Sequence, residues 1–244
     1  MTAIRGSLPA MRRFFGMGIL AALLCMPVAW AVNLDGIWKN NTPQPFLVPD
    51  GSAIPFTTAG QKAYEDNKAA LARGDYDDYD HVKSRCASPG LPRIMLTAER
   101  IEIFQRPQLL LMAFEWNRVR RTITLPGLPT QSTDFAGANA KLVGTAMGTS
   151  EGHWEGDTLV VSSTNFSANT LLDELVPHGY DLKITERIRL KNSKTLEDRI
   201  SVEDPVFFTR PWGSTLTYQR QPDAIIPEDT CLDKLRGPPP LPTR

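Results

Sequence analysis

Apolar and polar residues alternate along most of the chain between residues 94 and 220. Such period-two runs, bounded by turn residues, are typical of β-strands with one buried face. The clearest turn is Glu155-Gly156-Asp157, which follows Trp154 and precedes a β-branched run, as in a β-hairpin. The pattern predicts strands over residues 34–39, 94–98, 100–106, 108–116, 119–125, 151–155, 157–166, 181–191, 194–204 and 215–220.

One segment has helical character, from Thr57 or Thr58 to about Arg73. Thr58 is expected to cap this helix, and Gln61, three residues on, would complete a capping box. Gly74 is expected to end it, because glycine readily adopts the left-handed conformation found after helices.

Many short strands with a single helix favour an antiparallel barrel or sandwich. Connections between sequence neighbours dominate, so an up-and-down barrel is preferred over a Greek-key sandwich. Gly36-x-Trp38 at the first strand resembles the Gly-x-Trp of lipocalins. The predicted fold is therefore all-β: an antiparallel up-and-down barrel, lipocalin- or calycin-like, with one short N-terminal helix. A barrel of this size can hold one small ligand, and the long loop 126–148 has the length of a lid or binding loop.

The N-terminus has the features of an export signal. Three arginines precede an apolar stretch at 14–28, and a small-x-small cleavage site follows at 29–31. The apolar stretch is too short to span a membrane as a helix. We therefore expect residues 1–31 to be removed, leaving 32–244 as a single barrel domain. This domain would be periplasmic or secreted, with no stable membrane insertion.

Charge and cysteine content narrow the possible partners. Loss of three arginines leaves 24 basic and 27 acidic residues with no basic stripe, so nucleic acid is not an expected partner. Cys25 would leave with the signal, and the two remaining cysteines are Cys86 and Cys231. Export permits a disulfide between them, which we prefer over two free thiols. Neither has metal-ligand spacing to another Cys or a His, so no metal site is expected.

Two carboxylates occupy positions where apolar residues are expected. Period two places Glu186 within the apolar row of strand 181–191 and Asp198 within that of strand 194–204. A charge buried without a partner costs several kcal/mol, so such groups are paired, neutralised or exposed to a ligand. The functional interpretation is an acid/base pair in a barrel pocket. The alternatives are a buried ion pair with an arginine and a solvated barrel mouth.

Arg121 also lies in an apolar row. A three-residue loop at 116–118 would align it with Glu115, whereas a two-residue turn would place Glu115 opposite Arg120. We prefer the first, because it gathers the aliphatic residues on one face. Arg121 would then hold a substrate carboxylate with its planar fork. A structural bridge between Arg121 and Glu115 is the alternative.

Other polar and aromatic candidates lie in loops. His153 and His178 flank one strand pair, where either would pass protons near neutral pH or serve a structural role. Tyr180 would donate to a phenolate or carbonyl oxygen. Phe208 and Trp212 would line an aromatic pocket or plug the barrel. No phosphate-binding glycine loop and no Gly-x-Ser-x-Gly elbow occurs, so the predicted chemistry is cofactor-free acid/base work.

Three stretches together resemble a family of uncharacterised secreted bacterial proteins. They are Cys86-Ala-Ser-Pro-Gly-Leu-Pro-Arg-Ile-Met95, Trp154-Glu-Gly-Asp-Thr-Leu-Val-Val161, and Glu203-Asp-Pro205 with Thr209-Arg-Pro-Trp212; Glu186-Arg187 also matches. The chain departs from that family's arginine at His153 and from its serine at Gly179. The resemblance implies export, an all-β domain and an aromatic ligand. It also links the chain loosely to cofactor-independent lyases of lignin-derived aromatics.

The leading hypothesis is a periplasmic, cofactor-independent lyase, of decarboxylase or deformylase type, acting on a phenolic lignin-derived compound. Its catalytic candidates are Glu186, His178, Arg121, Tyr180 and His153, and its substrate-binding candidates are Glu115, Asp198, Trp212 and Phe208. The alternative is a lipocalin-like carrier of a small hydrophobic ligand. A third interpretation is an envelope protein whose barrel is filled by its own side chains.

Overall fold

The computed structural model describes residue 2 and residues 32–51, 53–127 and 144–231. Apart from residue 2, the export signal predicted at 1–31 lies outside the described residues, and so does most of the loop predicted at 126–148.

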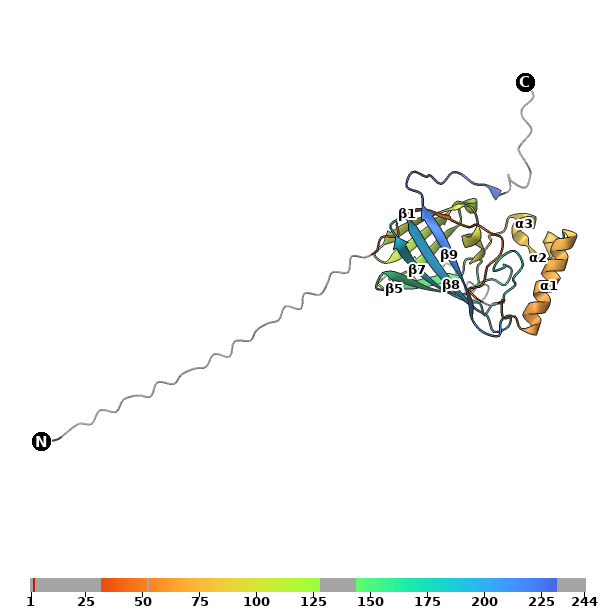
Figure 1. Ribbon diagram of the computed structural model, residues 1–244, viewed down its shortest axis with the longest axis horizontal. Coiled ribbons are helices and arrows are strands. Elements are labelled where there is room, and N and C mark those ends of the chain that lie inside the picture. The colour runs from red at the N-terminus through yellow and green to blue at the C-terminus, as the bar shows by residue number, and fades with distance from the viewer. Residues whose placement is uncertain (1, 3–31, 52, 128–143, 232–244) are drawn as a thin grey trace, which may run out of the picture. The chain divides into compact units, whose positions relative to one another are not determined.

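Nine strands of the described chain close into a barrel, in which each strand pairs with its neighbours in sequence (Figure 1). The first strand also pairs with the last, and this closes the sheet. The prediction of an all-β barrel is confirmed. The strands are β1 (Gly36–Asn40), β2 (Arg100–Arg106), β3 (Leu109–Phe114), β4 (Arg120–Thr124), β5 (Thr149–Glu155), β6 (Thr158–Thr164), β7 (Lys183–Asn192), β8 (Thr195–Glu203) and β9 (Trp212–Arg220).

The sequence pattern predicts a barrel that is antiparallel throughout, but one pair of strands in the structure is parallel. β4 and β5 run parallel, with Ile123 beside Ser150 and Thr124 beside Glu151, whereas the other neighbouring pairs are antiparallel. A parallel pair needs a crossover of a dozen or more residues. The chain between Thr124 and Thr149 is long enough to supply it. Apolar alternation carries no information on strand direction, so the prediction was wrong at this pair.

The strand predicted at 94–98 is wrong. Residues Arg93–Leu96 form a 3-10 helix, η1, whose four residues are all buried. A short apolar run buried on every side has no alternation that separates strand from helix. The last strand was also placed too late, since β9 begins at Trp212 and not at 215.

Helix α1 spans Thr58–Arg73, close to the predicted range, but its cap differs. Thr57, not Thr58, accepts a hydrogen bond from the Gly60 backbone N–H, and no capping box involves Gln61. Gly74 ends the helix in the left-handed region, with φ of 78°.

The expectation of a single helix is also wrong. The structure adds α2 (Tyr76–Tyr79), α3 (His81–Arg85) and a second 3-10 helix, η2 (Trp116–Arg118). Each is too short to show helical periodicity in sequence. No helix of the described residues is long and apolar enough to cross a membrane.

The barrel interior is packed with large side chains from all around the sheet. Trp38, Ile103, Leu110, Ile123 and Tyr218 are among those with at most 1% of their surface exposed. At one end of the barrel, Trp38 donates from Nε1 to the Leu34 carbonyl at 3.0 Å, and the Arg220 guanidinium lies 4.1 Å from its ring centroid. This packing leaves the polar interior residues surrounded by apolar ones.

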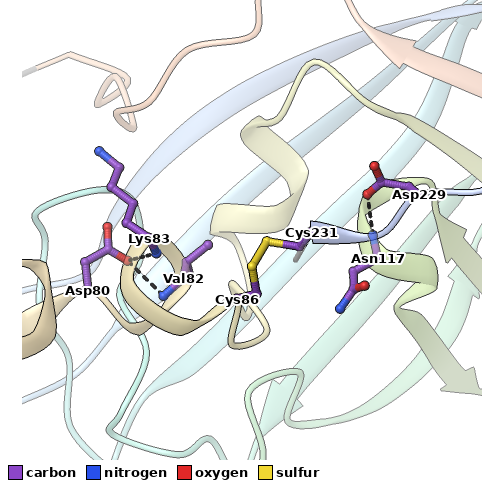
Figure 2. Close-up of a disulfide and its surroundings, with 7 residues drawn as sticks. All are labelled: Asp80, Val82, Lys83, Cys86, Asn117, Asp229 and Cys231. Carbon is purple, nitrogen blue, oxygen red and sulfur yellow. Dashed lines mark hydrogen bonds between the residues drawn. A yellow bond between two sulfur atoms is a disulfide. The ribbon is translucent and has the colours of Figure 1, made fainter. Parts of the chain in front are cut away.

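The predicted disulfide is present and joins Cys86, just after α3, to Cys231 near the end of the described chain (Figure 2). It closes a loop of 145 residues. A hydrogen bond also attaches this C-terminal segment to the barrel: the Asn117 backbone N–H donates to Asp229 Oδ2 at 2.8 Å. The alternative of two free thiols is therefore excluded in this structure.

Candidate functional site

A buried arginine–glutamate pair lies inside the barrel. Arg121 on β4 and Glu186 on β7 have side chains only 1% and 2% exposed. The guanidinium contacts the carboxylate through both Nη atoms, with Nη1 to Oε1 at 2.8 Å. This bidentate arrangement is the strongest form of a charge-assisted hydrogen bond. Of the alternatives for Glu186, the structure shows the buried ion pair.

Two serines and a methionine complete the surroundings of Arg121. Its Nε donates to Ser150 Oγ at 3.1 Å, and Nη2 donates to Ser163 Oγ at 2.9 Å. The remaining Nη1 contact is to Met112 Sδ at 3.8 Å. All five N–H groups of the guanidinium are thus engaged within the barrel. The arginine therefore holds an internal carboxylate, and its fork has no donor left for a substrate.

Asp198 on β8 lies in the same interior and is fully buried. Neither of its carboxyl oxygens has a hydrogen-bond partner among the described residues. Burial raises the pKa of Asp198 well above its ordinary value, the charge of Glu186 raises it further, and Arg121 only partly opposes this. The cluster thus contains one cation and two carboxyl groups, so one proton is needed for neutrality. The raised pKa favours Asp198 as the group that holds this proton.

Sequence reasoning missed Tyr218, which belongs to the same interior. Its Oη donates to the Met95 carbonyl at 2.9 Å. Burial raises the pKa of Tyr218 well above its ordinary value, and Asp198 and Glu186 add to this. The signal was available, because Tyr218 follows Leu216 in the inward row of β9. The cluster thus holds two neighbouring carboxyls, of which only Glu186 has an arginine partner.

Glu115 does not meet Arg121, contrary to the preferred prediction. The Phe114 N–H donates to the Val119 carbonyl, so four residues separate them and neither predicted turn forms. This register moves Glu115 to the other side of the sheet, because a one-residue shift reverses the face. There Glu115 accepts from the Arg100 backbone N–H at 2.8 Å and from its Nη1 at 3.1 Å.

His178 and Tyr180 lie apart from the interior cluster, and neither is hydrogen-bonded to Glu186. His178 is buried, with Nδ1 2.9 Å from the Gly179 carbonyl and Nε2 2.8 Å from Thr170 Oγ1. Burial lowers the pKa of His178, so the ring is neutral; Nδ1 then donates and Nε2 accepts. Both nitrogens are occupied, which favours the structural role. Tyr180 is 66% exposed.

His153 lies on the outside of the barrel. Its Nε2 is 3.2 Å from Glu155 Oε1, and both side chains are about half exposed. Glu155 also accepts from Arg187 Nη2 at 2.8 Å, and this bond, followed by that of His153, lowers the pKa of Glu155. His153 thus belongs to a surface network with Glu155 and Arg187 and does not contact Glu186.

Phe208 and Trp212 plug an end of the barrel. Their rings meet edge to face with centroids 5.5 Å apart, and Phe208 also packs on Phe56 at 5.7 Å. Phe56 in turn packs on Tyr64 of α1 at 5.2 Å. Phe208 and Trp212 are almost completely buried, so of the two predicted roles the structure shows the plug.

A concavity of about 680 Å³ lies on the outer face of β2, β3 and β4. We call it the outer-face groove. Its floor is apolar and its rim is charged; the floor is Phe104, Leu109, Leu111 and Ala113, and the rim is Glu102, Arg106, Arg118 and Arg120. Sequence reasoning missed it. The uninterrupted apolar run Leu109–Ala113 was the available signal, since a strand with one solvated face alternates.

No group of three or more His, Cys, Asp or Glu side chains that could hold a metal ion occurs among the described residues. A comparison with protein-family models finds none that matches the chain, and no curated protein matches it either.

Proposed function

We propose that the protein is an exported binding protein that carries a small aromatic or hydrophobic molecule in the outer-face groove. The observation that carries this proposal is the groove itself. Its volume, about 680 Å³, lies within the range of about 300–1,000 Å³ typical of small-molecule sites. Its apolar floor with a few charged groups at the rim is also the usual composition of such sites.

The groove supports binding better than the barrel interior does. Inward residues such as Trp38, Leu110 and Tyr218 are almost completely buried within the hydrophobic core. The proposed carrier therefore binds the small hydrophobic ligand expected from the sequence, but on the outside of the barrel and not in its interior.

Several features support the barrel type, the cellular location and the ligand class that this proposal includes. The sequential order of strands and the position of Trp38 at one end of the barrel favour a lipocalin-like barrel. The disulfide favours an oxidising compartment, and the predicted export signal favours a periplasmic or secreted location. The resemblance to a secreted bacterial family is consistent with both and with an aromatic ligand.

Binding to a panel of aromatic and aliphatic molecules, measured by native mass spectrometry, tests this function. Ala113→Trp should abolish binding, because the indole would fill the floor of the groove while remaining outside the barrel core. Ser162→Trp is the matched control, since Ser162 is exposed on β6, outside the groove. Wild-type protein that binds no member of the panel, or equal binding by the two variants, would refute the proposal.

A second candidate function is the cofactor-independent lyase acting on a phenolic, lignin-derived compound. The specific observation in its favour is Asp198, a buried acid with a raised pKa and two unpartnered oxygens, beside the Glu186–Arg121 ion pair. Such a pair of carboxyls is suited to moving a proton without a cofactor. Asp198 would supply the acid and Glu186 would be its conjugate partner.

Turnover of a phenolic lignin dimer, followed by the absorbance of the alkene formed, tests the lyase. Asp198→Asn should lower turnover by about a hundredfold or more, because an amide cannot donate the proton. Ser201→Asn, on the outward side of the same strand, should leave turnover unchanged. An unaltered rate in Asp198→Asn would remove Asp198 from the reaction.

A further inference from the structure

We infer that the outer-face groove selects amphipathic acids: molecules with an apolar aromatic or aliphatic body and one carboxylate, which Arg118 and Arg120 bind. This inference rests on the proposed binding function and names the ligand class of the same site.

The strand register arranges the groove as an apolar strip with charged residues at both ends. At one end Ala113 of β3 lies between Glu102 of β2 and Arg120 of β4. Four residues further back along β3, Leu109 lies beside Arg106. At about 3.4 Å per residue, the two ends are about 14 Å apart. That length accommodates two linked aromatic rings or a medium-length alkyl chain.

The arginines of the groove have no ion-pair partner in the part of the chain that the structure describes. Within the described residues, no carboxylate forms a salt bridge with Arg106, Arg118 or Arg120. The rim contains a single acid, Glu102, against these three cations. An anion bound there would therefore find guanidinium donors that no described carboxylate neutralises.

Several cations elsewhere on the barrel surface are paired with carboxylates. Glu197 contacts Arg189, Lys191 and Arg199 at 2.8–3.2 Å. Glu155 likewise pairs with Arg187 at 2.8 Å. The groove differs from these surfaces in that three arginines stand beside one acid, although the chain without its predicted signal has more acidic than basic residues.

One of the two carboxylate-binding arginines is already partly positioned. Arg118 donates from Nη2 to the Ile226 carbonyl at 3.2 Å, which anchors the guanidinium at the end of the groove. Arg106, at the far end, donates from Nη1 to the Gln105 carbonyl at 2.7 Å. Arg118 and Arg120 are two residues apart in the chain and both line the groove, so together they can form a two-armed site for one carboxylate.

The apolar floor of the groove indicates that the bound anion is part of a larger molecule. Phe104, Leu109 and Leu111 point outward and would remain in contact with water beside a small inorganic anion. An apolar body would remove them from water, at roughly 25 cal/mol for each Å² buried. The ligand therefore combines both properties, an acid group for the rim and an apolar body for the floor.

Isothermal titration with biphenyl-4-carboxylate and biphenyl-4-carboxamide tests the inference, since the two probes differ in charge and hardly in shape. Wild-type protein should bind the acid about tenfold more tightly or better, the usual worth of a hydrogen bond to a charged group. Arg120→Gln should bring the affinity for the acid close to that for the amide. Arg187→Gln removes the same charge from outside the groove and should change neither affinity.

The outcomes separate this inference from the proposed function. Equal affinity of wild-type protein for acid and amide would overturn the selectivity for acids and leave the binding function intact. Selectivity for the acid that survives both Arg120→Gln and Ala113→Trp would place the site elsewhere and overturn the inference as well. Wild-type protein that binds neither probe also overturns it, whereas the binding function is judged by the wider panel.

Discussion

Asp198 and Glu186 lie on adjacent strands inside the barrel, and Arg121 neutralises only Glu186. Glu186 pairs across the strands with Ile200, and Asp198 with Ile188, so the two carboxyls are offset by two residues along the sheet. Their closeness is a reason why the pKa of Asp198 is raised, after burial itself. Two carboxyls and one guanidinium make a polar core whose protonation is coupled to folding.

Asp198→Asn should remove a pH dependence of stability. Because burial raises the pKa of Asp198 in the folded state above its unfolded value near 3.9, the folded protein binds more protons there than the unfolded chain. The contribution to stability is therefore complete at pH below about 4 and is lost as the pH rises toward the folded pKa. Urea unfolding at a series of pH values should show that the free energy of unfolding of the variant rises relative to that of wild type from pH 4 upward. A difference that stays constant over that range would contradict this account.

Arg121→Met should destabilise the protein more than Glu186→Gln. Removing the arginine leaves two buried carboxyls without a cation, and breaking a buried pair in this way costs about 3–5 kcal/mol. Removing the Glu186 charge leaves Asp198 able to ionise beside Arg121, which limits the cost. The free energies of unfolding of both variants at pH 7 check the order. The destabilisation by Arg121→Met should also become smaller at acidic pH, where both carboxyls are protonated and are buried as neutral groups. If Glu186→Gln proved more destabilising than Arg121→Met, Asp198 would be unable to replace Glu186 as the partner of Arg121.

Much of the barrel was predictable from local pattern, and the exceptions have local reasons. β7 and β8 were located within about two residues, because each alternates cleanly over nine or ten positions. Residues 94–96 were assigned to a strand because a run buried on all sides has no period to read. The parallel pairing of β4 with β5 depends on a long connection whose path leaves no mark on the pattern of either strand.

The candidate site was predictable residue by residue but not as an assembly. A charge within an apolar row marked Glu186, Asp198 and Arg121 as inward, and the structure places all three inside. The partner of Arg121 depended on barrel closure, since β4 and β7 are distant in sequence. The outer-face groove depended on the side chains of three strands together, which no single alternating run describes.

Loss of the disulfide should destabilise the barrel without dismantling it. Cys86→Ser combined with Cys231→Ser opens a loop of 145 residues, which the chain-entropy model values at about 5 kcal/mol. Neither cysteine belongs to a barrel strand, so the far-ultraviolet circular dichroism should remain that of a β-barrel. Urea unfolding of wild type and variant, with and without a reducing agent, measures the change. Sensitivity of the double variant to reductant would show that the effect has another source.

His178→Gln should have a pH signature opposite to that of Asp198→Asn. Burial lowers the pKa of His178 below its unfolded value near 6.5, so the unfolded chain binds more protons and stability rises with pH. Wild type should lose stability as the pH falls from about 7 toward the folded pKa, because both ring nitrogens are already engaged and the charged ring would be buried. The glutamine variant lacks this titration, so its stability should fall less over the same interval. Parallel unfolding curves of the two proteins between pH 7 and pH 5 would show instead that His178 is free to become charged in the folded state.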